Sequence, residues 1–206
     1  MEISHSGRRA PGRPPSFERE AALGQAMHLF WRHGYEATSV AMLTRGMGIT
    51  APSLYAAFGD KRRLFLAAVD RYLQGGRAVP ALIDGAATAR QAARDLLTAA
   101  AIGDTGETTP AGCLLASAIV TCSEEAADVR EALAAMRRAI EARLRERIEA
   151  DVAAGRLPPG TDAEALAGHA MAVVQGMSTL AKDGAGRAKL LRIVEAAMAG
   201  WPPGGA

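Results

Sequence analysis

The chain has few of the residues that mark secreted, metal-binding or redox proteins. Only two cysteines, Cys113 and Cys122, occur among its 206 residues. This low number argues against a disulfide framework and is compatible with a reducing compartment. The four histidines lack zinc-binding spacing, and no P-loop, Gly-x-Ser-x-Gly or His-Glu-x-x-His motif occurs. The sequence therefore predicts no metal site, no cofactor and no enzymatic activity.

Long apolar runs and strand patterns are missing as well. The longest strongly apolar run, residues 111–120, is far shorter than a bilayer requires, and the N-terminus has no hydrophobic segment of the signal-peptide kind. Aromatic residues make up only 4% of the chain, and no β-branched run alternates with polar residues. We therefore expect a cytoplasmic, all-α protein with no membrane partner.

Charge is distributed unevenly along the chain. Residues 1–72 hold 10 Lys and Arg against 6 Asp and Glu, whereas residues 73–206 hold 14 against 16. A local positive excess can steer a protein toward DNA and makes the affinity depend on salt. The N-terminal third is therefore the expected DNA-binding part.

Residues 38–65 carry the pattern of a helix-turn-helix. Thr38 or Ser39 can cap a first short helix, Gly46 and Gly48 allow the chain to reverse, and Thr50 can cap a second helix. The second helix would present a surface of small residues that fits a major groove. That surface comprises Ala51, Pro52, Ser53, Tyr55 and Ala56.

A basic cluster follows this second helix. Asp60 can cap a third helix whose first turn holds Lys61, Arg62 and Arg63, an unfavourable place for cations in the field of a helix dipole. Cations at this position suggest a phosphate partner. The cluster alone is equally compatible with a solvated charged surface, but its combination with the turn and the small-residue helix favours DNA.

The segment from Ala21 to Leu66 resembles the N-terminal domain of the TetR family of transcriptional regulators, of the AcrR-like type. The resemblance rests on the Gly-Tyr-x-x-Thr-Ser element at residues 34–39 and the Leu-Tyr-x-x-Phe element at residues 54–58. It implies phosphate contacts from Thr38, Tyr55 and Lys61. The residues from Thr50 to Ser53, together with Ala56, are implied to face bases. Ser39 is a further candidate DNA-binding residue.

Two positions depart from the family pattern. Ala51 and Ala57 occupy places where members of the family often carry long polar side chains. Base recognition is then expected to depend on Ser53 and on apolar contacts, for instance with thymine methyl groups.

A second basic element lies at the N-terminus, where Arg9 and Arg13 occur in a stretch rich in proline and glycine. The tripeptide Gly-Arg-Pro at residues 12–14 resembles the core of an AT-hook, and an arginine-bearing arm fits a narrow A·T-rich minor groove. A solubilising tail is the alternative. We expect a basic arm at residues 1–15, a DNA-binding domain at 16–66 and a larger ligand-binding and dimerisation domain at 67–206.

Helical periodicity continues beyond the DNA-binding domain. Helices are predicted at 61–75, 88–103, 112–122, 125–154, 162–182 and 186–199, so that the chain should contain about nine.

The last two predicted helices have the pattern of an interface between subunits. One carries an apolar seam beside a stripe of small residues spaced four apart, which favours a homodimer over packing within a single subunit. The expected interface residues are Leu166, Gly168, Ala172, Val173, Gly176, Met177, Leu190 and Val194.

The regulatory signal is the least defined feature of the sequence. Gly112-Cys113-Leu114 resembles a stretch found in thiol-sensing members of the family, and the candidate ligand or thiol-sensing residues are Cys113, Cys122 and Met136. A buried cysteine in an apolar run is the alternative, and a non-covalent apolar inducer is then favoured. The expected function is a dimeric repressor released from a palindromic operator by a small molecule. The alternative is a ligandless architectural DNA-binding protein.

Overall fold

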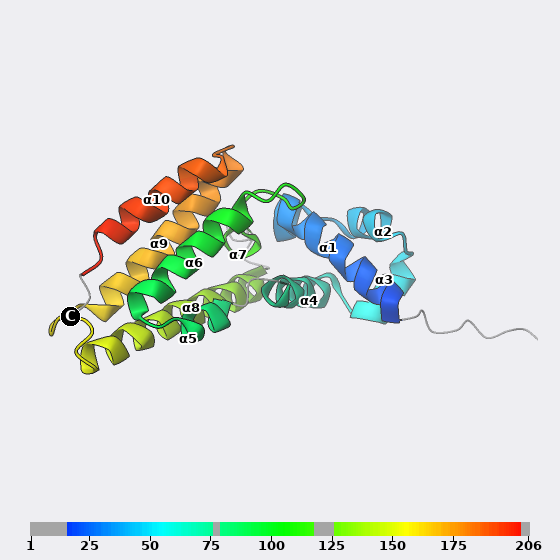
Figure 1. Cartoon of the computed structure of the whole chain (residues 1–206). Helices are drawn as coiled ribbons and strands as arrows, with labels where there is room; N and C mark the ends of the chain where they lie inside the picture. Colours follow the sequence, from blue (N-terminus) through cyan, green and yellow to red (C-terminus); the bar gives the residue numbers. More distant parts are fainter. Residues whose placement is uncertain (1–15, 76–78, 118–125, 203–206) are drawn as a thin grey trace, which may run out of the picture.

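The structure, a computed structural model, describes residues 16–75, 79–117 and 126–202. In these ranges it consists of helices and connecting turns, so the predicted all-α class is confirmed. The elongated molecule has two parts (Figure 1): α1–α3 at one end, and a bundle of α5, α6, α8, α9 and α10 at the other, with α4 and α7 between them. The helices are α1 (Ser16–Ala37), α2 (Val40–Met47), α3 (Ala51–Phe58), α4 (Lys61–Gln74), α5 (Val79–Gly85), α6 (Ala89–Asp104), α7 (Leu114–Ser117), α8 (Ala127–Ala153), α9 (Ala163–Lys182) and α10 (Arg187–Ala199).

The helix boundaries follow from capping and from glycine. Ser39 accepts a hydrogen bond from the amide of Met42 at the start of α2, and Thr50 accepts one from the amide of Ser53 at the start of α3. Gly48 ends α2 at a φ of 67°, a left-handed conformation that glycine adopts without steric cost. The predicted turn is therefore built as expected.

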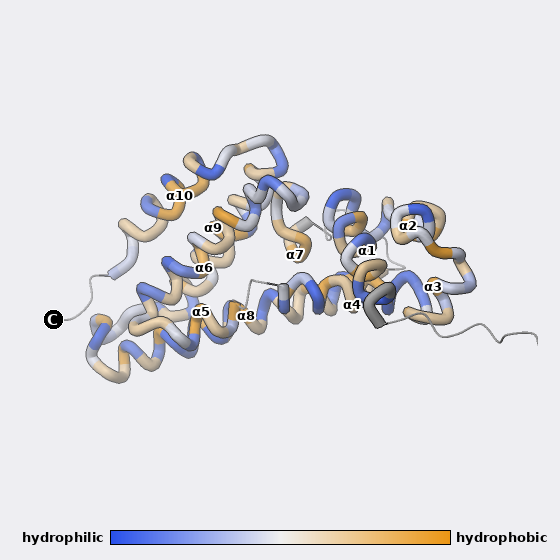
Figure 2. Tube along the Cα trace, turned by 45° about the vertical axis from the view of Figure 1, so that its right-hand side comes forward, coloured by the Kyte–Doolittle hydropathy of each residue, from blue (hydrophilic) through white to orange (hydrophobic). Residues whose placement is uncertain are grey.

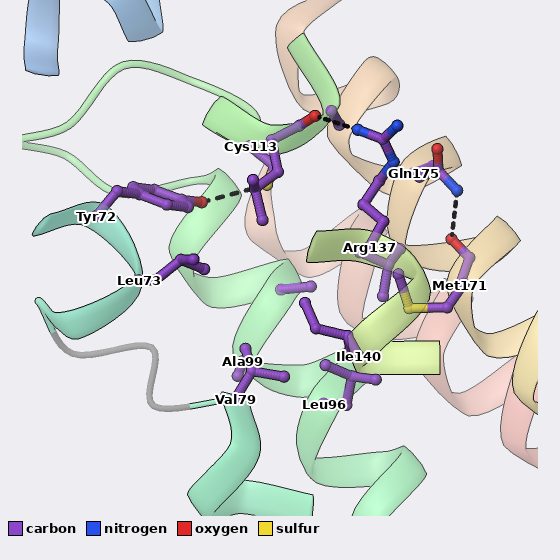
Figure 3. Close-up of a pocket in the computed structure, with 14 residues that line it drawn as sticks. Tyr72, Leu73, Val79, Leu96, Ala99, Cys113, Arg137, Ile140, Met171 and Gln175 are labelled. Carbon is purple, nitrogen blue, oxygen red and sulfur yellow. Dashed lines mark hydrogen bonds between the residues drawn. The ribbon is translucent and has the colours of Figure 1, made fainter. Parts of the chain in front are cut away.

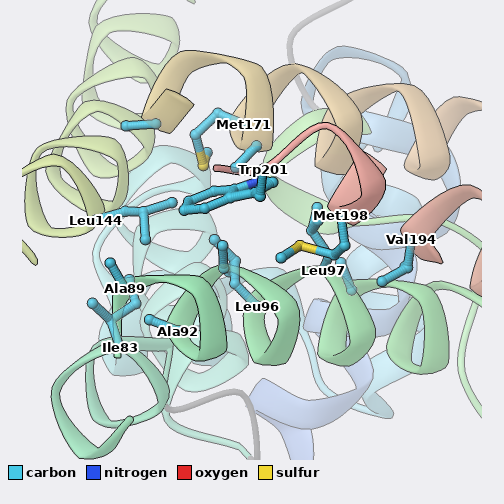
Figure 4. Close-up of a cluster of buried hydrophobic side chains, with 14 of the residues drawn as sticks. Ile83, Ala89, Ala92, Leu96, Leu97, Leu144, Met171, Val194, Met198 and Trp201 are labelled. Carbon is cyan, nitrogen blue, oxygen red and sulfur yellow. The ribbon is translucent and has the colours of Figure 1, made fainter. Parts of the chain in front are cut away.

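Two hydrophobic cores hold the protein together. The first joins α1–α4 to α7 and the start of α8, and its largest buried side chains include Phe30 and Phe65, whose ring centroids are 5.0 Å apart. The second lies within the bundle, where Trp201 packs among side chains such as Leu96 and Met171 (Figure 4). Burial on this scale is the main source of stability for both parts.

Helix α8 belongs to both cores. Val129 and Leu133 near its start are buried in the first core, whereas Leu144 and Ile148 near its end are buried in the second. Hydrophilic and hydrophobic residues alternate along α8 (Figure 2), as expected for a helix that packs on one side. A single rigid element therefore connects the DNA-binding part to the bundle.

Five of the predicted helices beyond the turn agree with the structure within two residues, namely α4, α6, α8, α9 and α10. Helix α5 was not predicted. The helix predicted at 112–122 appears as the short α7, with residues 118–125 outside the described part of the chain. The predicted domain boundary after residue 66 falls inside α4. None of the described helices is both long enough and apolar enough to cross a membrane.

Candidate DNA-binding surface and interhelical pocket

The small-residue surface of α3 faces solvent. Leu54 and Phe58 are buried and fix the helix against the first core, whereas Tyr55 is 49% exposed. Pro52, Ser53 and Ala56 are also exposed, and Ala51 is half-buried at the N-terminus of the helix. A helix held by one apolar stripe can therefore present the opposite face to a DNA groove.

The hydroxyl groups of Thr50 and Ser53 are hydrogen-bonded to each other, with their oxygen atoms 2.9 Å apart. Both side chains are solvent-exposed. A hydroxyl group carries one donor and two acceptor positions, so Ser53 retains capacity for a base edge while this contact fixes its rotamer.

Thr38 lies in a different environment from the one that the family resemblance implies. Its side chain is buried and its hydroxyl donates a 2.6 Å hydrogen bond to the carbonyl oxygen of Gly34. Gly34 has a φ of 80° and bends the C-terminal end of α1, which turns this carbonyl toward Thr38. The side chain is thus occupied with stabilising the bend and is not exposed to a phosphate. Ser39, rather than Thr38, is the cap of α2.

Lys61 begins α4 and is half-buried. Its ammonium group donates to the carbonyl oxygen of Glu36 at 3.3 Å and lies 4.5 Å from the centroid of the Tyr35 ring. Burial lowers the pKa of Lys61, and the charge of Glu36 partly offsets this effect. The ring and the carbonyl hold the cation in a defined place at the N-terminus of α4.

Two arginines add positive charge to the DNA-binding part. Arg45, in the last turn of α2, is exposed, and sequence reasoning missed it although it directly precedes Gly46 of the predicted turn. Arg62 forms an ion pair with Asp128 in the first turn of α8. This pair connects the N-terminus of α4 to the helix that enters both cores. Arg9 and Arg13, the candidates in the N-terminal arm, lie outside the described residues.

A mostly apolar pocket lies between α4 and the bundle (Figure 3). Its cavity volume is about 50 Å³, part of which opens to solvent. Side chains of α4, α5, α6, α8 and α9 line it together with the residues around α7. Tyr72 and Leu73 of α4 form one side, and Arg137 and Gln175 approach from the other. We call this space the interhelical pocket. A ligand larger than a few water molecules would therefore require the surrounding helices to move apart.

The three candidate ligand residues are separated in the structure. Cys113 lines the interhelical pocket, whereas Met136 lines a neighbouring recess between α5 and α8 that shares Leu73, Val79 and Ile140 with the pocket. Cys122 lies outside the described residues.

Cys113 is a packed residue. It is 8% exposed, its amide donates a 2.7 Å hydrogen bond to the hydroxyl of Ser178, and its sulfur accepts a hydrogen bond from the hydroxyl of Tyr72 at 3.3 Å. These contacts agree with the expectation of a buried, non-reactive cysteine, because reactive thiols are partly exposed.

Aromatic contacts connect the pocket to the DNA-binding domain. The rings of Trp31 on α1 and Tyr72 on α4 meet edge to face with centroids 4.9 Å apart. The indole N–H of Trp31 donates to the carbonyl oxygen of Gly112 at 2.7 Å, just before α7. A displacement of Tyr72 by a ligand would therefore reach α1 directly.

Three residues of the expected dimer interface are buried inside the subunit. Met177, Leu190 and Val194 belong to the second core and are at most 1% exposed. Their side chains pack between α9, α10 and α6, so they are not available to a second copy. The prediction that these three residues form the dimer interface is therefore wrong.

The other five expected interface residues lie nearer to the surface of α9. Leu166 and Val173 are half-buried against the second core, Gly168 is half-buried, and Ala172 and Gly176 are exposed. The small-residue stripe therefore faces outward while the apolar seam beside it faces inward. Periodicity distinguished the two stripes but not which of them packs within the subunit.

Comparisons with known proteins agree with this architecture. Residues 22–68 match the family described as bacterial regulatory proteins, tetR family, and residues 85–197 match the tetracyclin repressor-like C-terminal domain. The chain is 36% identical over 197 residues to the HTH-type transcriptional repressor ComR of Escherichia coli, covering 95% of this chain and 94% of the relative. It is 47% identical over 72 residues to the repressor BdcR of the same organism, which covers 35% of this chain and 36% of BdcR.

Solved structures give the same result. A cysteine-substituted variant of the TetR-family regulator CifR, complexed with 26-base-pair operator DNA, is 43% identical with a TM-score of 0.86 and covers 93% of this chain and 100% of its own. A TetR regulator from Rhodococcus sp. RHA1 is 39% identical with a TM-score of 0.62, covering 88% and 98%. These relatives are regulators and not enzymes, as the sequence predicted. The chain belongs to the TetR family of bacterial transcriptional regulators.

Proposed function

We propose that the protein is a dimeric, sequence-specific repressor that a small apolar molecule releases from a palindromic operator. The observation that carries this proposal is the position of the interhelical pocket, whose wall includes Tyr72 and Leu73 of α4. The same helix begins at Lys61 and Arg62 beside the DNA-binding surface. The repressors ComR and BdcR and the operator complex of CifR support the DNA-binding part of the proposal.

Release follows from differential affinity. A ligand that fits the pocket better when α4 is displaced stabilises that displaced state, and the position of α3 changes with α4. In a dimer, two α3 helices must match two half-sites about one helical turn apart, so a change in their separation weakens binding to both.

The small-residue stripe of α9 supports the dimer. Gly168, Ala172 and Gly176 would let two helices approach closely, and α10 lies beside α9 in the bundle (Figure 1). Ala172→Arg should therefore produce a monomer in analytical ultracentrifugation. Ala150→Arg, at an exposed position of α8, is the matched control and should remain dimeric. A dimeric Ala172→Arg protein would contradict this interface.

The DNA-binding proposal is tested by selecting genomic fragments with the purified protein at physiological salt and footprinting the best fragment. A palindromic site with two spaced half-sites supports the proposal. Retention without sequence preference would favour the architectural alternative, which the presence of an apolar pocket disfavours. Failure to retain any DNA would contradict both.

A further inference from the structure

The interhelical pocket has a positively charged end within an otherwise apolar wall. Arg137 of α8 lines it beside Cys113. Lys182 of α9 lies close to the same place, because a Cβ atom at Gly112 would come within 2.9 Å of its Cγ. Among the described residues, neither cation forms an ion pair with a carboxylate. Arg137 is thus the charged residue that lines the pocket, whereas Lys182 is exposed and lies beside Gly112.

The guanidinium of Arg137 is only partly used by the protein. Its Nη1 donates a 2.9 Å hydrogen bond to the carbonyl oxygen of Leu115, at the α7 side of the pocket (Figure 3). A guanidinium has five N–H donors, and the described part of the chain provides an acceptor for one of them. Gln175, which also lines the pocket, donates its side-chain amide to the carbonyl oxygen of Met171 at 3.3 Å (Figure 3).

Burial at this end disfavours positive charge. Desolvation lowers the pKa of Arg137, an effect that neighbouring Arg138 increases, and desolvation also lowers the pKa of Lys182. The acidic group that raises either pKa is the Cys113 thiol. A negatively charged group of a ligand would therefore interact favourably with the guanidinium of Arg137.

The rest of the pocket selects for an apolar body. Leu73, Val79, Leu96 and Ile140 line the interior away from Arg137. A molecule with an apolar body and a single charged end therefore matches the lining chemically, and its binding would widen a cavity that has a volume of about 50 Å³ in this structure.

We propose that the ligand of the interhelical pocket is a small apolar monocarboxylate whose carboxylate binds Arg137. This inference rests on the proposed function and adds the chemical class of the inducer. A planar guanidinium donates two parallel hydrogen bonds to a carboxylate, a geometry that an alcohol or an amide of the same body does not reproduce. The hydrogen bond to Leu115 fixes the guanidinium before the ligand arrives.

The test compares hexanoate and octanoate with hexanamide and octanamide, which have the same chains without the negative charge. Each is titrated calorimetrically into the full-length protein, and the same samples are assayed for release from the operator fragment obtained by selection. The carboxylates should bind at least about tenfold more tightly than their amides.

Arg137→Met keeps the alkyl stem and removes the charge, so the ratio between carboxylate and amide should fall to about one. Arg137→Lys should restore part of the ratio. Arg145→Met, at an exposed position of the same helix that pairs with Glu149, is the matched control and should leave the ratio unchanged. Circular dichroism melting confirms that each variant is folded, since loss of the Leu115 contact alone would lower stability without removing selectivity.

The possible outcomes separate the inference from the proposed function. Equal binding of carboxylates and amides would overturn the inference while leaving a ligand-responsive repressor, and so would an unchanged ratio in a folded Arg137→Met protein. Binding of neither series to a protein that still binds its operator would also overturn it. Absence of operator binding in the ligand-free protein would instead contradict the proposed function.

Discussion

The indole nitrogen of Trp31 lies 2.7 Å from the carbonyl oxygen of Gly112, a buried hydrogen bond that connects α1 to the segment before α7. Trp31→Phe removes the donor and leaves a buried carbonyl without it. The free energy of unfolding should fall by about 1–3 kcal/mol more than the smaller ring alone would cause. Urea unfolding followed by circular dichroism measures this loss.

The control is the only other tryptophan of the chain. Trp201 is equally buried, and its indole nitrogen has no hydrogen-bond partner among the described residues. Trp201→Phe should therefore destabilise the protein less than Trp31→Phe. Equal losses in the two variants would mean that the bond to Gly112 contributes nothing measurable.

Gly112 is required by the close approach of α9. Its φ is 80°, and a Cβ atom there would lie 2.9 Å from the Lys182 Cγ and 3.0 Å from the carbonyl oxygen of Ser178. Gly112→Ala should therefore lose about 1–3 kcal/mol beyond the cost of the left-handed backbone conformation. Gly160→Ala is matched, because Gly160 has a φ of 84° with nothing within 4 Å. The urea midpoint of Gly112→Ala should be lower than that of Gly160→Ala. Equal midpoints would show that the neighbouring atoms move aside without cost.

Lys61 is expected to contact phosphate at the N-terminus of α4. Lys61→Met should weaken binding to all DNA sequences, and the slope of log affinity against log salt should become shallower by about one unit. Fluorescence anisotropy over a salt series measures both effects. Lys189→Met, at an exposed position of α10, should change neither. An unchanged salt slope in Lys61→Met would show that Lys61 does not contact phosphate.

The same residue predicts a dependence on pH. Because burial lowers the pKa of Lys61 below its ordinary value of 10.5, its charge is lost at a lower pH than that of an exposed lysine. The contribution of Lys61 to DNA affinity is therefore present at neutral pH and declines as the pH rises through this lowered pKa. Wild-type affinity should fall in that alkaline range more steeply than the affinity of Lys61→Met.

Ser53 is the polar side chain of α3 that we expect to recognise a base. Ser53→Ala removes the hydroxyl but keeps the amide that Thr50 caps, so stability should change little while sequence preference changes at one base position. Sequencing of selected random duplexes measures the preference. Thr50→Ala provides the contrast, because loss of the cap should cost about 1 kcal/mol of stability and weaken binding in general. An unaltered preference in Ser53→Ala would exclude direct readout by this side chain.

Cys113 is expected to be a packing residue. In a Cys122→Ser background, its thiol should react with N-ethylmaleimide much more slowly than in the urea-unfolded chain, because it is buried and hydrogen-bonded to Tyr72. Cys113→Ser should preserve release by a non-covalent inducer, since a hydroxyl can accept the same hydrogen bond. Fast modification of the folded protein, accompanied by release from DNA, would instead establish the thiol-sensing alternative.

Local signals in the sequence predicted the helix-turn-helix well. The caps Ser39 and Thr50 and the turn at Gly48 act within a few residues of themselves, so their effects can be read without knowing the fold. Helix α5 was missed because Val79–Gly85 is short, contains Pro80 and has too few turns for a periodic pattern.

Environments that depend on distant elements could not be predicted. Thr38 is buried because Gly34 bends the preceding helix, and Met177 packs inside the subunit because α6 lies against α9. A helical period identifies which residues share a face, but it carries no information about what covers that face. The interhelical pocket could not be predicted from the sequence for the same reason, because residues of α4–α9 form its wall.

Tyr72 contacts both the pocket and the DNA-binding domain, because its ring packs against Trp31 and also forms part of the pocket wall. Any substitution that enlarges the pocket near this ring also loosens its support for α1. Under the proposed mechanism, sensitivity to the inducer and tightness of repression are then not separately adjustable traits. Selection for a response at lower inducer concentration would be accompanied by leakier expression of the regulated genes, unless a compensating change arose on the α1 side of the contact.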